Sequence, residues 1–310
     1  MERDIRLIIH RRIDIREPVM LVAWPGMGNV ALGSIDYIRR QLRAIRFAEI
    51  DISAYFIPDR VIVEEGLVRF PRPPSHTFYY TKNPDLIIFE GEEQVGGKAG
   101  VKLIDTILGL AQELRVNRLY AGAAFPMPIY HTDPSLVYGV TTSPYLRDVL
   151  LRDYGVRIMD NGQISGLNGL ILSYAQKRGI EACCLLATIP IYAVNVYNPK
   201  ACKAIIQTLE RILKIKVGFT ELDLAIEEME RRMKMIEEQI RSITPREDIP
   251  KETEEEGEIP KYVLLRIERL FEEAKKDKSK AYELKRELDR WGLFKSYEDR
   301  FLDLFKREEL

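Results

Sequence analysis

Two glycine-rich turns contain most of the residues through which this chain could bind a small molecule. Glycine accepts positive φ angles and lets a ligand or another backbone approach closely. A turn that opens a helix also points free N–H groups at anions. Both turns are therefore candidate sites for a phosphate or another small ligand. The candidate ligand-binding residues are Gly26, Met27, Gly28 and Asn29 in the first turn, Asn161, Gly162, Ser165, Gly166, Asn168 and Gly169 in the second turn, and Glu92 and Gln94 between them.

The first turn matches part of a dinucleotide-binding fingerprint. The spacing Gly26-x-Gly28-x-x-Ala31 fits G-x-G-x-x-G/A, and Glu49 and Asp51 follow roughly 20 residues later, where that fingerprint has an acid. Glycine turns between a strand and a helix also occur without a ligand. The sequence leaves open a structural turn, a phosphate or small-ligand site, and an NAD site.

We expect no catalytic residue, because no nucleophile lies in a recognisable constellation. His10, His76 and His131 are far apart in the sequence and lie in or beside polar or proline-rich segments, where histidines are usually solvated. Ser165 lies between glycines but does not form G-x-S-x-G. The chain also contains no P-loop motif G-x-x-x-x-G-K-[ST], which weakens the case for ATP hydrolysis.

The acids and thiols of the chain are the candidate metal ligands. Glu90, Glu92 and Glu93 cluster after an apolar strand, where they could hold Mg²⁺ or could instead cap neighbouring backbone and face water. The three cysteines lack metal-ligand spacing, and their apolar surroundings predict buried free thiols in a reducing compartment. We therefore expect no bound metal and no cofactor. The cysteines are Cys183, Cys184 and Cys202.

The charge balance excludes a general nucleic-acid binder. The 310 residues carry a net charge of only -1, without the basic excess that such a binder shows. Residues 1–218 have a net charge of +5 and residues 219–310 one of −6. No apolar run reaches the roughly 18 residues that a membrane span requires, and no signal peptide precedes the first strand. We expect a cytoplasmic protein without a nucleic-acid or membrane partner.

Strands alternate with helices over residues 1–218, which predicts a three-layer α/β/α domain with a largely parallel sheet. In such sheets ligands bind beyond the carboxyl ends of the strands, where both glycine turns are expected. Ser143-Pro144 is a strong helix start. The expected strands are 19–24, 47–52, 61–63, 67–70, 77–81, 86–89, 118–125, 137–142 and 182–188, and the expected helices are 30–42, 101–114, 143–154, 169–177 and 199–212.

The remaining residues, 219–310, are expected to form a helical tail. An apolar seam spaced 3, 4, 3, 4, 3, 4 predicts a heptad helix over residues 219–241, which forms either an intermolecular coiled coil or one arm of a helical hairpin. Residues 244–260 are acidic and contain three prolines, as in a flexible linker. Residues 261–310 are expected to form short helices. The seam consists of Phe219, Leu222, Ile226, Met229, Met233, Ile236 and Ile240.

Five segments, in this order, resemble the proteasome assembly chaperone family named after the second chaperone subunit, and the archaeal branch above all. The resemblance covers roughly residues 5–215, and the second glycine turn is its most specific part. Members of this family have also been grouped with ATP-grasp enzymes, but we see no pair of ATP-grasp subdomains here. The segments are Pro25–Ala31, Glu90–Gln94, Asn161–Gly169, Pro190-x-Tyr192 and Asn198-Pro199-x-Ala201.

The resemblance implies an α/β/α sandwich of the purine nucleoside phosphorylase type that assembles into small homo-oligomers. It favours a non-enzymatic binding protein, a proteasome assembly chaperone or a related interaction factor, with proteasome subunits as partners. The alternative is a nucleotide- or nucleoside-binding enzyme that uses the two glycine turns. The chain ends in Glu308-Glu309-Leu310 and lacks the hydrophobic–Tyr–any terminus with which related chaperones dock on proteasome subunits.

Overall fold

The computed structural model describes residues 5–58, 61–243, 261–276 and 280–304. The chain divides into two compact units, Met1–Ile243 and Thr244–Leu310. The predicted linker 244–260 and the terminal residues 308–310 lie outside the described residues.

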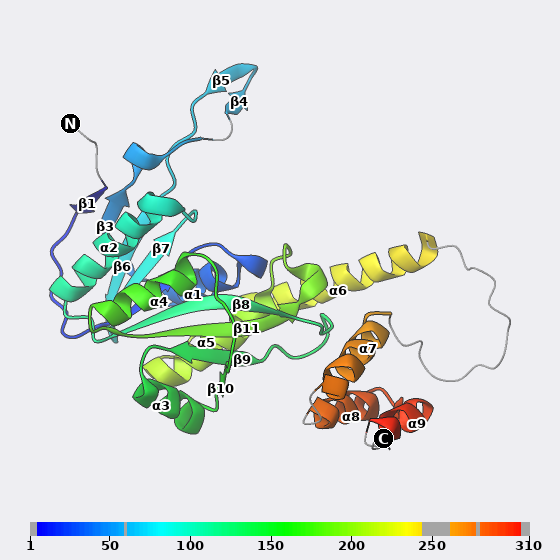
Figure 1. Cartoon of the computed structure of the whole chain (residues 1–310). Coiled ribbons are helices and arrows are strands. Elements are labelled where there is room, and N and C mark those ends of the chain that lie inside the picture. The colour runs from blue at the N-terminus through cyan, green and yellow to red at the C-terminus, as the bar shows by residue number, and fades with distance from the viewer. Residues whose placement is uncertain (1–4, 59–60, 244–260, 277–279, 305–310) are drawn as a thin grey trace. The chain divides into compact units, whose positions relative to one another are not determined.

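The first unit is built on one mixed sheet of nine strands among the described residues, in the order β1-β3-β6-β7-β2-β8-β11-β9-β10 (Figure 1). The expected core strands are all present, and β10 was not anticipated because two residues carry too little pattern. The strands are β1 Arg6–Ile9, β2 Val19–Ala23, β3 Ile45–Asp51, β6 His76–Lys82, β7 Asp85–Gly91, β8 Arg118–Met127, β9 Val137–Thr141, β10 Arg157–Ile158 and β11 Glu181–Pro190.

The sheet is parallel at its centre and in the edge pair β9–β10. Strands β7, β2, β8 and β11 pair in parallel, whereas β1, β3, β6 and β7 form an antiparallel succession and β9 runs antiparallel to β11. The expectation of a largely parallel sheet is therefore wrong for its flanks. The connection between Lys82 and Asp85 holds two residues, and a link that short joins only antiparallel strands.

Helices cover both faces of the sheet, as expected for three layers. Along β2, Met20, Val22 and Trp24 enter one hydrophobic cluster, while Leu21 and Ala23 enter the cluster on the other face. This alternation is the period of two that any strand imposes. Helices α2 Gly97–Glu113 and α4 Leu167–Lys177 cover the first face, and α1 Val30–Gln41, α3 Pro144–Tyr154 and α5 Pro199–Leu213 cover the second.

A hairpin projects from the edge of this unit (Figure 1). It contains β4 Ile62–Glu64 and β5 Leu67–Arg69, which pair only with each other within the described part of the chain. The short helix η2 Ser53–Tyr55 precedes it. We call residues 56–58 and 61–71 the arm.

The heptad helix is α6 Thr220–Ile243. It belongs to the first compact unit, although the sequence pattern assigned it to the helical tail 219–310. The first half of the predicted seam packs within its own chain: Leu222 lies in the cluster beneath α5, and Met229 and Met233 pack against Ala193. Ile236 is exposed. An intermolecular coiled coil thus stays a prediction for the second half of α6. The side chain of Ile240 is not among the side chains that the structure describes.

The second unit has its own hydrophobic core. Its helices are α7 Lys261–Lys276, α8 Ala281–Arg290 and α9 Phe294–Asp303. Their shared core includes Ile267, Leu270, Phe271, Leu284, Leu288 and Phe301.

Candidate functional site

The two glycine turns lie together at one rim of the sheet, as the sequence predicted. The first joins β2 to α1 through the short helix η1 Met27–Asn29, and the second precedes α4. Asn168, in the first turn of α4, is their direct link. Its Oδ1 accepts a hydrogen bond from the Trp24 N–H at 3.0 Å, and its Nδ2 donates to the Trp24 carbonyl at 3.1 Å. Since Trp24 is fully buried, this amide satisfies two backbone groups that water cannot reach.

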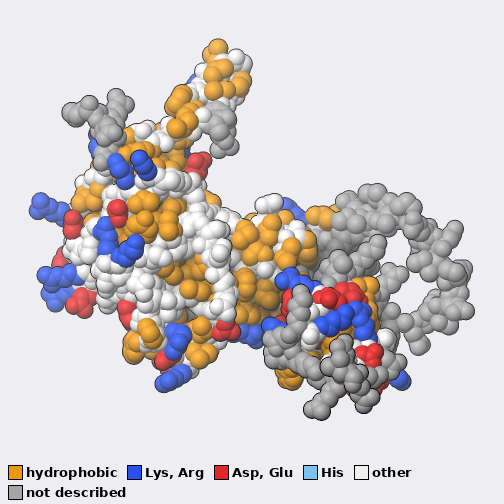
Figure 2. Space-filling view, viewed as in Figure 1, with side chains coloured by type: hydrophobic (Ala, Val, Ile, Leu, Met, Phe, Trp, Pro, Cys, Tyr) orange, Lys and Arg blue, Asp and Glu red, His pale blue; other side chains and the backbone are white. Residues whose placement is uncertain are grey.

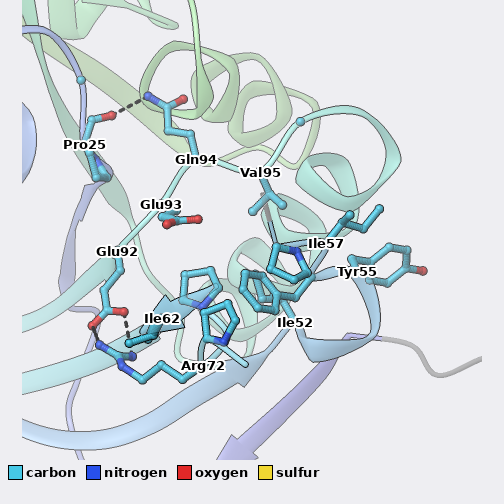
Figure 3. A pocket seen from close by; sticks show the side chains of 16 residues that line it. Pro25, Ile52, Tyr55, Ile57, Ile62, Arg72, Glu92, Glu93, Gln94 and Val95 are labelled. Atoms are coloured by element: carbon cyan, nitrogen blue, oxygen red, sulfur yellow. Dashed lines mark hydrogen bonds and ion pairs between the residues drawn. The ribbon is translucent and has the colours of Figure 1, made fainter. Parts of the chain in front are cut away.

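Gln94 makes a second link between the turns. Its Nε2 donates to the Pro25 carbonyl at 2.6 Å (Figure 3), and its Oε1 accepts the Leu167 N–H at 2.8 Å. Leu167 is the first residue of α4, so its N–H is one of the donors that an anion at this helix would use. The Gln94 amide occupies that donor.

Gly166 is required by both its backbone and its surroundings. Its φ of +78° lies where other residues are strained, and a Cβ atom there would come within 2.3 Å of the Gln94 Oε1. Gly169 is equally restricted, because a Cβ atom would lie 2.6 Å from the Ile164 carbonyl oxygen. These glycines let the second turn approach its neighbours closely.

The first turn is closed by the segment that follows β11. The Gly28 N–H donates to the Val194 carbonyl at 2.7 Å, and the Asn198 N–H donates to the Gly28 carbonyl at 2.9 Å. The Asn29 N–H donates to the Gly26 carbonyl at 2.9 Å. Three backbone groups at the start of α1 thus bond within the chain, which favours the structural interpretation of this turn over the phosphate one.

The remaining candidate residues lie around this junction without entering it. Gly26 is beside it, since a Cβ atom there would lie 3.9 Å from the Asn168 Nδ2. Glu92 points to another partner, Arg72, at 2.9 Å, and accepts the Ser75 N–H at 2.8 Å. Like Gly26 and Glu92, the other members are exposed, and they are Met27, Asn29, Asn161, Gly162 and Ser165. A role of these residues in ligand binding stays a prediction.

A cavity of about 920 Å³ lies between the first turn and the base of the arm (Figure 3). Apolar side chains such as Ile52, Tyr55, Phe56 and Val95 line it, and Arg72, Glu92 and Glu93 provide its charges. The carboxylate of Glu92 is held by Arg72, which lowers the pKa of Glu92.

Glu90 forms a partly buried ion pair that the sequence did not reveal. Arg39 of α1 donates through Nε to both Glu90 oxygens at 2.8 Å, and its guanidinium lies 4.6 Å from the centre of the Tyr79 ring. Burial raises the pKa of Glu90 to about 7, against the opposing effect of Arg39. Of the three acids considered as Mg²⁺ ligands, Glu90 and Glu92 therefore have cationic partners in the chain itself.

The acid of the proposed dinucleotide fingerprint lies elsewhere. In an NAD-binding fold it follows the strand beside the glycine turn, but β6 and β7 separate β3 from β2. Asp51 instead accepts hydrogen bonds from Ser53 and Arg6, and the Ser53 hydroxyl is the main cause that lowers the Asp51 pKa to about 2. This position contradicts the NAD interpretation of the first turn, because Asp51 does not lie where the fingerprint requires its acid.

Two of the three histidines are buried, contrary to the expectation of solvated side chains. His76 starts β6, its Nδ1 lies 3.2 Å from the Pro74 carbonyl, and burial lowers its pKa. His131 lies against the Tyr192 hydroxyl, 3.2 Å from its Nδ1. The segments around both histidines look polar in the sequence. In the structure the His76 side chain packs against β7 and the His131 side chain against the loop after β11.

Cys183, Cys184 and Cys202 are buried and free, as predicted. Over the described ranges, no three His, Cys, Asp or Glu side chains are arranged to hold a metal. Nor does any helix in those ranges have the length and apolarity to cross a membrane.

Solved structures with this fold include two proteins of Pyrococcus furiosus. PbaB, described as an archaeal proteasome activator, matches with a TM-score of 0.65 and 24% identity, covering 76% of this chain and 100% of that one. PbaA, described as an archaeal homologue of proteasome-assembly chaperone, matches with a TM-score of 0.61 and 20% identity, covering 77% and 94%. At these identities the likeness shows the fold.

Sequence comparison identifies the family. The uncharacterized protein MJ1210 of Methanocaldococcus jannaschii is 27% identical over 243 residues, which are 76% of this chain and 88% of that protein. The model of the PAC2 family matches residues 20–237, a stretch that contains both glycine turns, Gln94 and most of α6. The chain belongs to the PAC2 family.

Proposed function

We propose that this protein is a non-enzymatic binding protein that associates with proteasome subunits, as an assembly chaperone or a related interaction factor. The observation that carries the proposal is the PAC2 family match over residues 20–237. The fold shared with PbaB and PbaA supports it, since both are described by their relation to the proteasome. On the same ground we propose that the protein is cytoplasmic.

The geometry of the two turns supports binding rather than catalysis. Asn168 and Gln94 use both ends of their amides within the chain. Because both amides are hydrogen-bonded within the chain, they hold the two turns in one arrangement. A substrate site instead needs polar groups aimed at the ligand. A fixed rim suits recognition of another protein's surface.

We propose that the rim contacts the proteasome subunit through apolar side chains beside the first turn. Met27 lies in that turn, and Ile191, Tyr192, Val196 and Tyr197 lie in the segment after β11 that hydrogen-bonds to Gly28. All five are between 41% and 55% exposed, although they are large and apolar or aromatic. Aromatic residues and methionine are enriched in protein interfaces. We call these five residues the rim patch.

The test is capture of proteasome subunits by the full chain. The tagged protein is purified from extract of its own cells, and the co-purifying proteins are identified by mass spectrometry. We expect proteasome α or β subunits with the wild type, and at least tenfold less with Met27→Glu plus Ile191→Glu. The matched control is Leu151→Glu on α3, which is 53% exposed and does not belong to the rim patch. Absence of proteasome subunits from the wild-type sample would refute the proposal.

We also propose that the protein is a homo-oligomer. The support is the exposed apolar surface on the arm and on the second half of α6, where Met235 and Ile236 are exposed. Contiguous apolar surface of this kind marks an interaction site in a monomer.

A further inference from the structure

The arm carries more exposed apolar surface than its own chain can cover. In β4 and β5, Val63 lies directly opposite Val68, and the alternation of strands places Val61 and Phe70 on the same side. These four side chains are 56% to 73% exposed. We call them the apolar face of the arm; Figure 2 shows hydrophobic side chains gathered on this projection.

The other side of the hairpin is used differently. Ile62 lies there and lines the cavity beside the first turn. Glu64 and Arg69 also lie there and form an ion pair at 3.0 Å. The strand charges therefore neutralise each other on the side opposite Val63 and Val68. Phe70 contacts the ring of Phe56, which lines the cavity, edge-on with 6.2 Å between the ring centres.

The size of this surface fits an interaction site. Val61, Val63, Val68 and Phe70 expose roughly 500 Å² of apolar surface, within the roughly 300–600 Å² of the largest apolar patch on a typical monomer, which is often functional. A two-stranded hairpin is also marginally stable alone in water. Docking of a partner on the arm would thus both cover the apolar face and stabilise the hairpin.

We propose that the arm packs face to face with the arm of a second copy of this chain. The proposal rests on the homo-oligomeric binding protein proposed above and names its self-association surface. An apolar surface without charges is typical of permanent interfaces, whereas transient partners meet through more polar surfaces. A second copy presents the same face at the same concentration, so a twofold contact closes on itself and leaves neither face exposed.

The first test measures the mass of the full chain in solution by sedimentation and light scattering. Val61→Lys plus Val68→Lys places two like charges on each apolar face. We expect the wild type to be oligomeric and this variant to have at most half its mass. The control, Tyr145→Lys plus Leu151→Lys, adds the same charge to exposed positions of α3 and should leave the mass unchanged. A monomeric wild type, or an unchanged mass for the arm variant, would overturn the proposal.

The second test does not depend on a disruptive substitution. The native thiols Cys183, Cys184 and Cys202 are buried, so a cysteine placed on the arm is the accessible one. Val68→Cys, treated with a short bismaleimide, should give a covalent dimer on a denaturing gel. Leu151→Cys on α3 should stay monomeric. Equal dimer yields from the two variants would exclude arm-to-arm packing.

Subunit capture separates this inference from the proposed function. If the arm variant is smaller and the wild type captures no proteasome subunit, the arm contact stands and the proposed function fails. If the arm variant keeps its mass but loses the captured subunits, the arm binds that partner and self-association through it is refuted.

Discussion

The hydrogen bonds of Asn168 give the sharpest test of how the two turns are held. Asn168→Ala leaves the Trp24 N–H and carbonyl buried without their partners. An unsatisfied buried backbone group costs roughly 1–3 kcal/mol, so we expect the free energy of unfolding to fall by roughly 2–5 kcal/mol. The control is Asn161→Ala, an exposed position in the same turn that should change stability by less than about 0.5 kcal/mol.

The assay is urea denaturation of the full chain followed by tryptophan fluorescence. Trp291→Phe is used as the background in all samples, so that the signal comes from Trp24 in the first unit. With an m-value of about 3 kcal/mol/M, the midpoint of Asn168→Ala should fall by roughly 1 M. Equal midpoints for the Asn168→Ala and Asn161→Ala variants would refute the structural role assigned to Asn168.

Asn168→Asp adds a pH signature to the same test. An ionised Asp accepts from the Trp24 N–H, but its second oxygen faces the Trp24 carbonyl, whereas a protonated Asp can donate to that carbonyl. Burial and the facing carbonyl raise the folded-state pKa above the unfolded value of about 4. The stabilisation is therefore present at low pH and lost as the pH rises through the folded pKa. We expect the stability gap to wild type to narrow from pH 8 to pH 5; a constant gap would contradict this geometry.

Three further predictions concern the same unit. Gly166→Ala should lower stability by about 2 kcal/mol or more, because its φ is +78° and Gln94 occupies the position of the new Cβ, whereas Gly96→Ala, at φ −90° with open space around it, should be nearly neutral in the same urea titration. Because the pKa of Glu90 is about 7 in the folded state and about 4.3 unfolded, the wild type should lose up to about 3 kcal/mol as the pH rises from 4.5 to 7. Glu90→Gln should remove that part of the slope, and an unchanged slope would show that Glu90 is ionised throughout. Burial raises the pKa of Cys184 and of Cys202 to about 12, so the folded protein should react with a thiol reagent only slowly at pH 8, and a fast reaction of any native cysteine would contradict the burial.

Local patterns in the sequence predicted most elements of the fold correctly. Ser143 caps α3 as expected, accepting the Leu146 N–H at 3.3 Å, with Pro144 in the first turn. The continuous apolar run of β2 and the helical period of α1 were also sufficient, because each depends on residues within a few positions of one another. Caps and periods are short-range physics, so the sequence alone determines them.

The functional surfaces depended on contacts between distant residues. Asn168 meets Trp24 across 144 positions of the chain, and Gln94 meets Leu167 across 73. No local pattern encodes such pairs, which is why their amides looked like ligand-binding groups before the structure showed them bonded to the backbone. The inward side chains of His76 and His131 and the Arg39–Glu90 pair were undetectable for the same reason.

The sequence by itself determined the three layers, the start of α3 and the apolar seam of α6. Burial of a periodic face is needed wherever such a face occurs. Only the tertiary structure decided what covers each face. Leu222, Met229 and Met233 are covered by the protein's own chain, whereas Val63 and Val68 of the arm are not. The physical reason is that hydrophobic burial is non-directional: a pattern states that a surface must be covered, and the packed fold decides by which partner.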